Sequence, residues 1–548
     1  MIPKLRISST IILTCFLSLT QATMGGDSLE ESVKWKLDQP KSGDLFGYEI
    51  VKSGNTLVVA APGRDDGEGA VFLLDASTGE GLQTLLSPRP ELESYFGLRV
   101  AMDGNLAAVA APYEDGDGDD QGAVYLIDLA NDNTTRIIPD DIEDLDLFGS
   151  SIALRGNLLL IGAYKADGEG SDRGAVYIYD IGLKEFTGKL IAPDAADGDE
   201  FGISIALFEK FVAVGAWKGD GIEVGEIDRG AGYLFNVLTG EFLYKVVPSG
   251  PDVRGAHFGV SSFISNGVLA FGAHTELFRV EGDDGYYRGA VYLFDLNSGD
   301  EVLRLQPVGT ESDDAFGSSI AISEDLILIG GNQADEGAIQ STGAAWLYDL
   351  ATGRELRRLK ASDGGADDQL GISVILDGRR AAIGSVLEDP DPNEATGAIY
   401  WFDFAPRPDA LIGESRSALR GDNRYNTSGA GQRIRQRSTR GMRSFFSAEN
   451  DGSLKDRLRV SSRRSSQKFR YQYRKLSGGG ANVTGAVASG RYLTPVLFPG
   501  ERIDFRATAT PRGRSNRNRS ETVRTVIRST EAAMSDVVRN DLVVPRDR

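Results

Sequence analysis

The 548-residue sequence contains very little of the side-chain chemistry on which most enzymes depend. Cys15 is the only cysteine, and His257 and His274 are the only histidines. One cysteine excludes an intramolecular disulfide, so burial and hydrogen bonding must stabilise the fold. The scarcity of thiols and imidazoles also argues against the usual nucleophiles and metal centres of enzymes. We therefore expect that the protein is not an enzyme.

Long apolar segments are also scarce. The run at residues 11–19 is shorter than the ~20 apolar residues that cross a bilayer, and no later stretch approaches that length. Lys4 and Arg6 precede this run and Ala22 follows it, which is the order of a secretory signal. We predict a signal peptide over residues 1–22, no transmembrane segment, and a protein that is secreted, extracellular or associated with the cell surface.

A repeat occupies the first 400 residues. Each unit opens on Phe-Gly, or on Leu-Gly in the last unit, and the spacing of successive glycines is 50 to 58 residues. The glycines are Gly47, Gly97, Gly149, Gly202, Gly259, Gly317 and Gly371. Each unit has the pattern of four short strands, for example residues 150–154, 158–163, 174–180 and a last strand ending near 191. Such a unit is typical of a propeller blade, because one sheet cannot bury both faces alone. The sequence predicts an all-β fold with a seven-bladed β-propeller.

A second motif strengthens this interpretation. Two small residues and then proline or an aromatic recur at residues 60–62, 110–112, 162–164, 215–217 and 272–274, and Gly-Ala-Val-Tyr begins at 122, 174 and 289. With the Phe-Gly pairs, these motifs resemble the FG-GAP repeats of integrin α-chain propellers over residues 33–404. Integrin calcium loops lie between the two motifs, where this sequence has short turns such as 53–55 and 155–157. The integrin calcium sites are therefore not carried over.

The ends of the repeat region indicate how the ring closes. Residues 33–37 precede the first Phe-Gly pair and have the pattern of the fourth strand of other units, whereas the seventh unit meets Pro406 and Pro408 where its fourth strand should begin. We expect the strand at 33–37 to complete the last blade, because this leaves no open edge. The propeller then spans residues 23–404, with a linker near 405–409.

The charge changes sign at this boundary. Residues 405–548 contain 30 Lys and Arg against 13 Asp and Glu, whereas residues 1–404 contain 29 against 67. About seven short strand-like runs predict that residues 405–548 form a basic β-sandwich, which resembles immunoglobulin-like modules of bacterial exoproteins. Phe469, Tyr471 and Tyr473 alternate with polar residues, which favours one buried strand face over stacking on nucleic acid. Opposite charges of this size also predict a charge-driven contact between the two domains.

The acidic residues of the propeller collect in the long loops, which should lie on one face of the disc. Asp115, Asp117 and Asp119 alternate with glycine and could offer calcium several hard oxygens. The alternative is a solvated acidic loop, since no bidentate glutamate follows at the spacing of established calcium loops. His257 and His274 should lie towards the same face, and His274 takes the proline position of the motif, which indicates a turn residue.

These features favour a binding or adhesion scaffold that presents an acidic loop face to an extracellular protein or glycan. Two alternatives stay open: a secreted hydrolase that uses propeller carboxylates, and a purely structural extracellular module.

Overall fold

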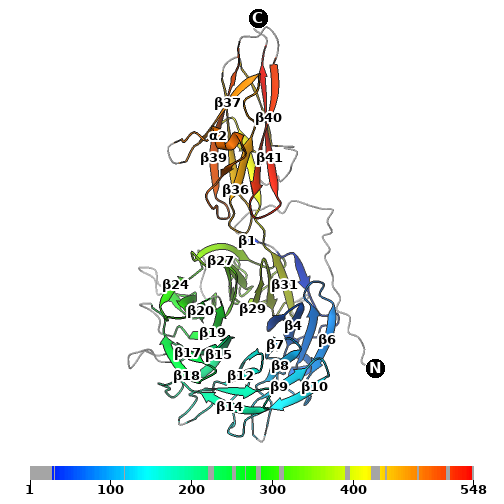
Figure 1. The fold of residues 1–548 in the computed structure, drawn as a ribbon. Helices are drawn as coiled ribbons and strands as arrows, with labels where there is room; N and C mark the ends of the chain where they lie inside the picture. Colours follow the sequence, from blue (N-terminus) through cyan, green and yellow to red (C-terminus); the bar gives the residue numbers. More distant parts are fainter. Residues whose placement is uncertain are drawn as a thin grey trace. The chain divides into compact units, whose positions relative to one another are not determined.

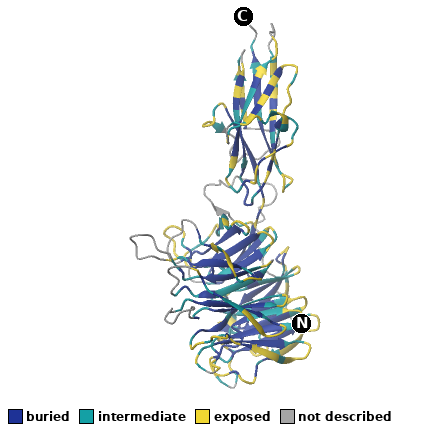
Figure 2. Ribbon diagram, turned by 60° about the vertical axis from the view of Figure 1, so that its left-hand side comes forward, coloured by how far each residue is buried: buried dark blue, intermediate teal, exposed yellow. Residues whose placement is uncertain are grey.

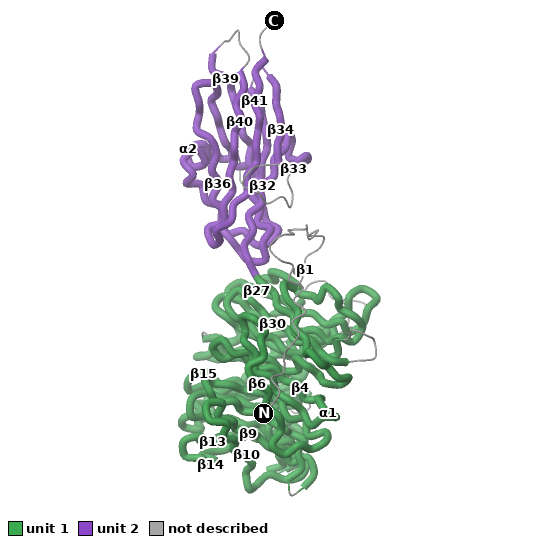
Figure 3. The backbone as a smooth tube through the Cα atoms, turned by 90° about the vertical axis from the view of Figure 1, so that its right-hand side faces the viewer, with its two compact units in different colours: residues 1–22, 27–403 green, residues 23–26, 404–548 purple. Residues whose placement is uncertain are grey.

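The computed structural model describes residues 28–29, 31–116, 118–168, 170–219, 228–249, 255–265, 267–278, 286–307, 314–388, 395–420, 432–438, 441–477, 480–513 and 519–545. The chain divides into two compact units: unit 1 extends to Asp403 and unit 2 begins at Phe404 (Figure 3). Strands dominate both units, and the helices of the described residues are α1 (Arg64–Gly67) and α2 (Thr484–Ala488). Neither helix, nor any other in the described part of the chain, is long and apolar enough to span a membrane.

Seven sheets, each with four antiparallel strands at its centre, form most of the described part of unit 1, and we number them sheets 1 to 7. Sheets 1 and 2 consist of β3 (Ile50–Ser53), β4 (Thr56–Ala61), β5 (Ala70–Asp75) and β6 (Gly81–Leu86), and of β7 (Arg99–Asp103), β8 (Leu106–Ala111), β9 (Ala123–Asp128) and β10 (Asn133–Ile137). Sheets 3 and 4 consist of β11 (Ser151–Arg155), β12 (Leu158–Ala163), β13 (Ala175–Asp180) and β14 (Glu185–Leu190), and of β15 (Phe201–Phe208), β16 (Phe211–Ala216), β17 (Ala231–Asn236) and β18 (Glu241–Val246).

The remaining sheets follow the same plan. Sheet 5 consists of β19 (Phe258–Ser265), β20 (Val268–Ala273), β23 (Ala290–Asp295) and β24 (Glu301–Leu305), with a small hairpin of β21 (Leu277–Phe278) and β22 (Tyr286–Tyr287) between its second and third strands. Sheet 6 consists of β25 (Ser319–Ser323), β26 (Leu326–Gly331), β27 (Ala344–Asp349) and β28 (Arg354–Leu359), and β1 (Ser28–Leu29) pairs in parallel with β28. Sheet 7 consists of β29 (Leu370–Asp377), β30 (Arg380–Ser385), β31 (Ala398–Asp403) and β2 (Val33–Trp35).

The seven sheets are arranged in a closed ring. The first strand of each sheet contacts the first strand of the next, from β3 through β7, β11, β15, β19, β25 and β29, and β29 contacts β3 again. Figure 1 shows first strands such as β7, β15 and β19 nearest the centre and fourth strands such as β6, β10, β14 and β18 at the circumference. The end of the ring at which first strands begin and second strands end is called the loop end below.

Sheet 7 combines residues from both ends of the repeat region. In β2, Val33 lies opposite Trp401 and Trp35 lies opposite Ile399, so β2 is the fourth strand of this sheet. The rings of Trp35 and Trp401 also meet edge to face at a centroid distance of 5.3 Å. The strand ends at Trp35, two residues before the end of the segment 33–37 in which the sequence predicts a strand.

The two repeat motifs form the boundary between adjacent sheets. Every motif phenylalanine, and Leu370 in the last unit, is fully buried. Phe201, which opens sheet 4, forms a bridge to Gly174 at the start of the third strand of sheet 3. Gly174 has φ +80°, and a Cβ there would lie 2.0 Å from the carbonyl oxygen of Phe201. Glycine is therefore required at this position, because no side chain fits the approach or favours that backbone.

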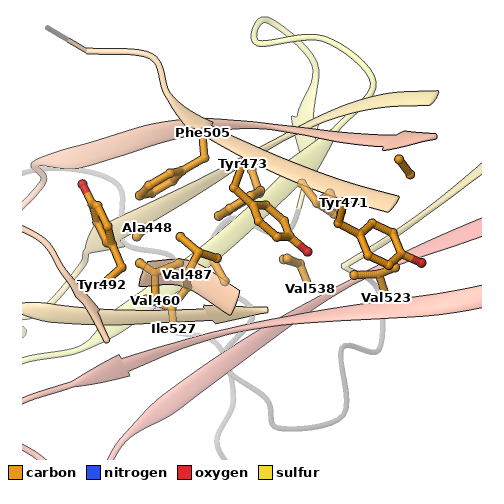
Figure 4. Close-up of a cluster of buried hydrophobic side chains, with 14 of the residues drawn as sticks. Ala448, Val460, Tyr471, Tyr473, Val487, Tyr492, Phe505, Val523, Ile527 and Val538 are labelled. Atoms are coloured by element: carbon orange, nitrogen blue, oxygen red, sulfur yellow. The ribbon is translucent and has the colours of Figure 1, made fainter. Parts of the chain in front are cut away.

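Unit 2 contains two five-stranded sheets that share one core. The first has the order β33 (Leu419–Arg420), β32 (Pro408–Gly413), β35 (Met442–Asn450), β39 (Arg502–Pro511) and β37 (Phe469–Lys475). The second has the order β34 (Arg433–Arg437), β41 (Ser535–Val544), β40 (Arg519–Ser529), β36 (Leu458–Ser462) and β38 (Tyr492–Leu493). Tyr471, Tyr473 and Phe505 of the first sheet pack against Val460 and Ile527 of the second (Figure 4).

In unit 2 one sequence expectation is confirmed and another needs adjustment. Phe469, Tyr471 and Tyr473 are buried and Arg470, Gln472 and Arg474 are exposed, so the alternation along β37 does separate a core face from a solvated face. The expected linker at 405–409 is too long, because β32 begins at Pro408 and pairs with β35 along its whole length. Pro408 is the first residue of its strand, which is a position that proline tolerates.

Candidate binding site at the centre of the ring

The ring encloses a central cavity of about 760 Å³. The first strands of sheets 1 to 5 and sheet 7 line it along their length, and Ser319 and Ile320 contribute from sheet 6. At the loop end, Tyr48, His274, Asn332 and Gln333 also border it. This volume is in the range of cavities that hold small ligands or the end of a larger one.

One position of the repeat, two residues after the motif glycine, lies at every boundary between first strands. Five of the seven sheets have serine there: Ser151, Ser204, Ser261, Ser319 and Ser373. Four hydroxyls donate to the motif glycine carbonyl of the next sheet, from Ser151 to Gly202 at 2.6 Å, Ser204 to Gly259 at 2.7 Å, Ser261 to Gly317 at 2.7 Å and Ser319 to Gly371 at 2.8 Å. The fifth, Ser373, accepts the N–H of Ile50 at 3.0 Å. At this position the serine hydroxyl hydrogen-bonds one sheet to the backbone of the next, and we call this contact the serine clip.

Sheets 1 and 2 replace the serine with Glu49 and Arg99, which lie side by side in the ring. Glu49 Oε2 accepts the N–H of Val100 at 3.1 Å, and Arg99 Nε donates to the carbonyl of Ser150 at 3.1 Å. Burial raises the pKa of Glu49 to about 7, although the Arg99 charge acts in the opposite direction. The clip is thus kept, but two groups that carry charge now border the cavity.

Tyrosines gather around Arg99. Its guanidinium lies 5.8 Å from the ring centroid of Tyr48, and Tyr95 and Tyr113 meet edge to face at 5.6 Å. Burial raises the pKa of Tyr113 and raises that of Tyr164 to about 12, while the nearby Arg99 opposes both rises. The phenols of Tyr113 and Tyr164 therefore stay neutral and offer hydroxyl donors near a permanent cation.

An aromatic cluster of Trp217, His257 and His274 lies at the same end of the ring. Trp217 and His274 directly follow the second strands of sheets 4 and 5, and His257 precedes β19. The His257 ring lies 5.0 Å from Trp217 and 5.6 Å from His274, and the planes of Trp217 and His274 are inclined by 18°. Trp217 Nε1 donates to Glu200 at 2.5 Å, and Lys218 donates to the other oxygen at 2.6 Å. The three rings form one partly buried platform.

The hydrogen bonds define the state of the histidines. Thr275 donates its hydroxyl proton to the carbonyl of Gly255 at 2.7 Å, so His257 Nδ1, at 2.8 Å from the same oxygen, must be the donor. His257 Nε2 then has a free lone pair. Burial lowers the pKa of His257 and lowers that of His274 to about 4. Both imidazoles are therefore uncharged at neutral pH. His274 lies in a turn, as the sequence predicts, and it also borders the cavity.

The predicted calcium residues are only partly described. Asp115 and Asp119 are exposed, and Asp117 lies outside the described residues. Asp115 Oδ1 accepts the N–H of Asp120 at 3.0 Å, so this carboxylate stabilises its own turn. Within the described ranges, no group of three or more His, Cys, Asp or Glu is placed to hold a metal ion.

Some of the acidic residues that the sequence places in the loop face are buried. Glu114 is fully buried and accepts the hydroxyl of Tyr125 at 2.6 Å and Arg136 Nε at 2.9 Å. Asp146 and Asp368 each accept a backbone N–H three residues earlier, and burial raises the pKa of both to about 6. This aspartate can be recognised in the sequence, because it lies two residues before the motif Phe or Leu. It occurs in five units, as Asp44, Asp146, Asp199, Asp314 and Asp368.

The repeated sheets and their motif glycines define a repeat β protein of propeller type. Five segments of the chain match the family model of the FG-GAP repeat, at residues 91–127, 132–179, 185–235, 300–348 and 354–402. The chain therefore contains FG-GAP repeats. Sheet 1 lies outside these segments but has the same geometry, with Phe46 buried and Gly47 at φ +95°.

Among solved structures, one similar chain is the hydrazine synthase of Kuenenia stuttgartiensis, at 14% identity and a TM-score of 0.44. The match covers 68% of this chain and 97% of that chain. A comparison with curated proteins finds no match.

Proposed function

We propose that the protein is a secreted or cell-surface binding scaffold, of the adhesion type, without catalytic activity. In this proposal the ring is a seven-bladed β-propeller, unit 2 is an immunoglobulin-like sandwich, and the loop end of the ring binds an extracellular protein or glycan. One observation carries the proposal: the serine clip is replaced by Glu49 and Arg99 at the cavity. Five serines already satisfy this position structurally, so two chargeable replacements support a role in recognition.

The chemistry of the loop end favours a particular kind of ligand. Arg99 is a half-buried cation: its Nε and Nη1 donate to the carbonyls of Ser150 and Leu98, and its second Nη can face a carboxylate. Trp217 and His274 present uncharged flat rings, against which the apolar face of a sugar or an aromatic side chain can pack. A glycan that carries a uronic acid combines both features. The exposed acids of the loops, including Asp115 and Asp119, could add contacts, and calcium at Asp115, Asp117 and Asp119 stays a prediction.

Binding of a panel of neutral and uronic-acid oligosaccharides to the full chain would test this proposal. We expect at least one acidic oligosaccharide to bind, and Arg99→Gln and Trp217→Ala each to weaken that binding at least tenfold. Tyr287→Ala is the matched control, because Tyr287 is an exposed aromatic on the small hairpin β21–β22. Melting curves would verify that all variants fold. Acidic oligosaccharide binding that both loop-end variants retain in full would contradict the site.

The competing function is hydrolysis, and Glu49 is the residue that would favour it. A carboxyl with a pKa near 7 at a cavity is a candidate general acid. Glycoside hydrolysis generally uses two carboxylates, and Glu49 is the one carboxyl among the described residues that line the cavity. Product formation from the bound oligosaccharide that is lost in Glu49→Gln would replace the binding proposal with this one.

A further inference from the structure

The second sheet of unit 2 has a strongly basic outer face. Along β34, β36 and most of β40 buried and more exposed residues alternate, whereas β41 is mostly buried and is more exposed at Ser535, Arg539 and Val543. Figure 2 shows such alternating colours on strands of unit 2. The outward positions hold seven arginines, which we call the arginine face: Arg433, Arg435, Arg437, Arg459, Arg524, Arg528 and Arg539. Residues paired across neighbouring strands share one face of a sheet, so the strand register determines how these arginines are arranged.

The register places like charges directly opposite one another. Arg539 in the middle strand pairs with Arg433 on one side and with Arg524 on the other. A second row pairs Arg528 with Arg459. Neighbouring strands lie about 4.8 Å apart, so each row sets guanidinium groups side by side. Like charges directly opposite one another destabilise a sheet, so an anion bound across each row would relieve this repulsion.

Carboxylates on this face do not balance the arginines. Asp541 is the single acid at the outward positions of the described strands, and it already pairs with Arg433 and accepts the hydroxyl of Thr522 at 2.6 Å. Arg539 Nε is buried and has no hydrogen-bond partner among the described residues. The face therefore carries far more positive than negative charge, arranged in rows across one sheet.

We propose that the arginine face binds a sulfated polysaccharide. Guanidinium forks match sulfate and carboxylate oxygens, and successive rows fit a polymer with regularly spaced anions. The other outward side chains of these strands are serine, threonine, valine and leucine, whereas single-stranded nucleic acids are held by aromatic stacking. This surface belongs to unit 2 and is independent of the site at the centre of the ring.

Affinity measurements with the full chain test this assignment. The probe is dextran sulfate at several salt concentrations, with neutral dextran as the negative probe. The triple variant Arg433→Ser, Arg524→Ser, Arg539→Ser should weaken binding at least tenfold. It should also lower the slope of log affinity against log salt by about two, since three cations are lost. Trp217→Ala should leave dextran sulfate binding unchanged, which separates this proposal from the ring site.

The matched control replaces Arg443, Arg470 and Arg474 with serine. These arginines are exposed on the other sheet of unit 2, so the net charge changes equally. If both triple variants lose affinity to the same extent, only net charge matters and the arginine face is not a site. Tighter binding of single-stranded DNA than of dextran sulfate would also overturn the assignment. If the first triple variant unfolds, Arg433→Ser with Arg524→Ser leaves the partly buried Arg539 in place and should show two thirds of the slope change.

Discussion

At the residue scale, the same strained conformation recurs before every motif Phe or Leu. The residue has φ between 50° and 56° in all seven units: Leu45, Tyr95, Leu147, Glu200, His257, Ala315 and Gln369. A left-handed backbone costs a residue other than glycine about 1–2 kcal/mol. Because Leu45 and Ala315 share the conformation without any reactive group, it belongs to the turn of the repeat. That turn nevertheless brings Glu200 and His257 to the loop end.

The pKa of Glu49 leads to a prediction about stability and pH. The folded protein retains the proton up to about pH 7, whereas the unfolded chain releases it near 4.5. The contribution of Glu49 to the free energy of unfolding is therefore largest below pH 4.5 and falls as the pH rises to 7. Glu49→Gln removes this fall. Between pH 4.5 and pH 8 the free energy of unfolding of the wild type should therefore drop by up to about 3 kcal/mol more than that of the variant.

Denaturant titrations at both pH values measure that difference. Glu80→Gln is the control, since Glu80 is exposed. The comparison isolates Glu49, because Asp146 and Asp368 titrate equally in wild type and variant. Parallel pH profiles of wild type and Glu49→Gln would show that Glu49 is not buried in this way.

At the element scale, the strands of the repeat are predictable from sequence because the motifs fix their ends. Residues 158–163 are predicted as a strand and form β12 with the same bounds. The central site is not predictable in this way. Glu49 and Arg99 can be recognised as site residues only once the serine position is known to border the cavity. The cavity exists only in the closed ring, so the sequence does not show this. The strands β34 and β41 are also hard to predict from sequence, because arginine and aspartate interrupt their apolar residues.

The pairing of β2 predicts a large effect of losing this strand. Deletion of residues 31–40 removes Trp35 from the core beside Trp401 and leaves the edge of β31 unpaired. The melting temperature of unit 1 should fall by well over 5 °C. Trp35→Ala should produce a smaller fall in the same direction. Melting curves that match the wild type would mean that sheet 7 does not need its fourth strand.

At the scale of the whole molecule, the two units carry opposite charge. Residues 405–548 have a net charge of +17 and the preceding residues −38, from the counts of their charged side chains. Such fields act over about 10 Å at 0.1 M salt. We expect attraction between the units, either within one molecule or between two, and competition between the acidic loops and the polysaccharide for the arginines.

Small-angle scattering at low and high salt measures this attraction. Attraction within one molecule predicts a larger radius of gyration as salt rises, and attraction between molecules predicts dissociation of oligomers. The triple variant of the arginine face should reduce the salt effect. A radius and mass that stay constant across the salt series would show that the units do not associate through charge.

The pairing of β2 with β31 also has a consequence for the time course of folding. More than 360 residues separate Val33 from Trp401, its partner, so this contact cannot form until nearly all of unit 1 has been synthesised. Contacts of such long sequence separation form slowly, and a chain that waits for them exposes strand edges. Sheets 1 to 6 contain no strand beyond β28, so they can form before β31 has been synthesised. Sheet 7 can form only afterwards, because it needs both β31 and β2. Until sheet 7 closes, the edge of β31 stays unpaired, and an unpaired strand edge is a site at which aggregation can begin.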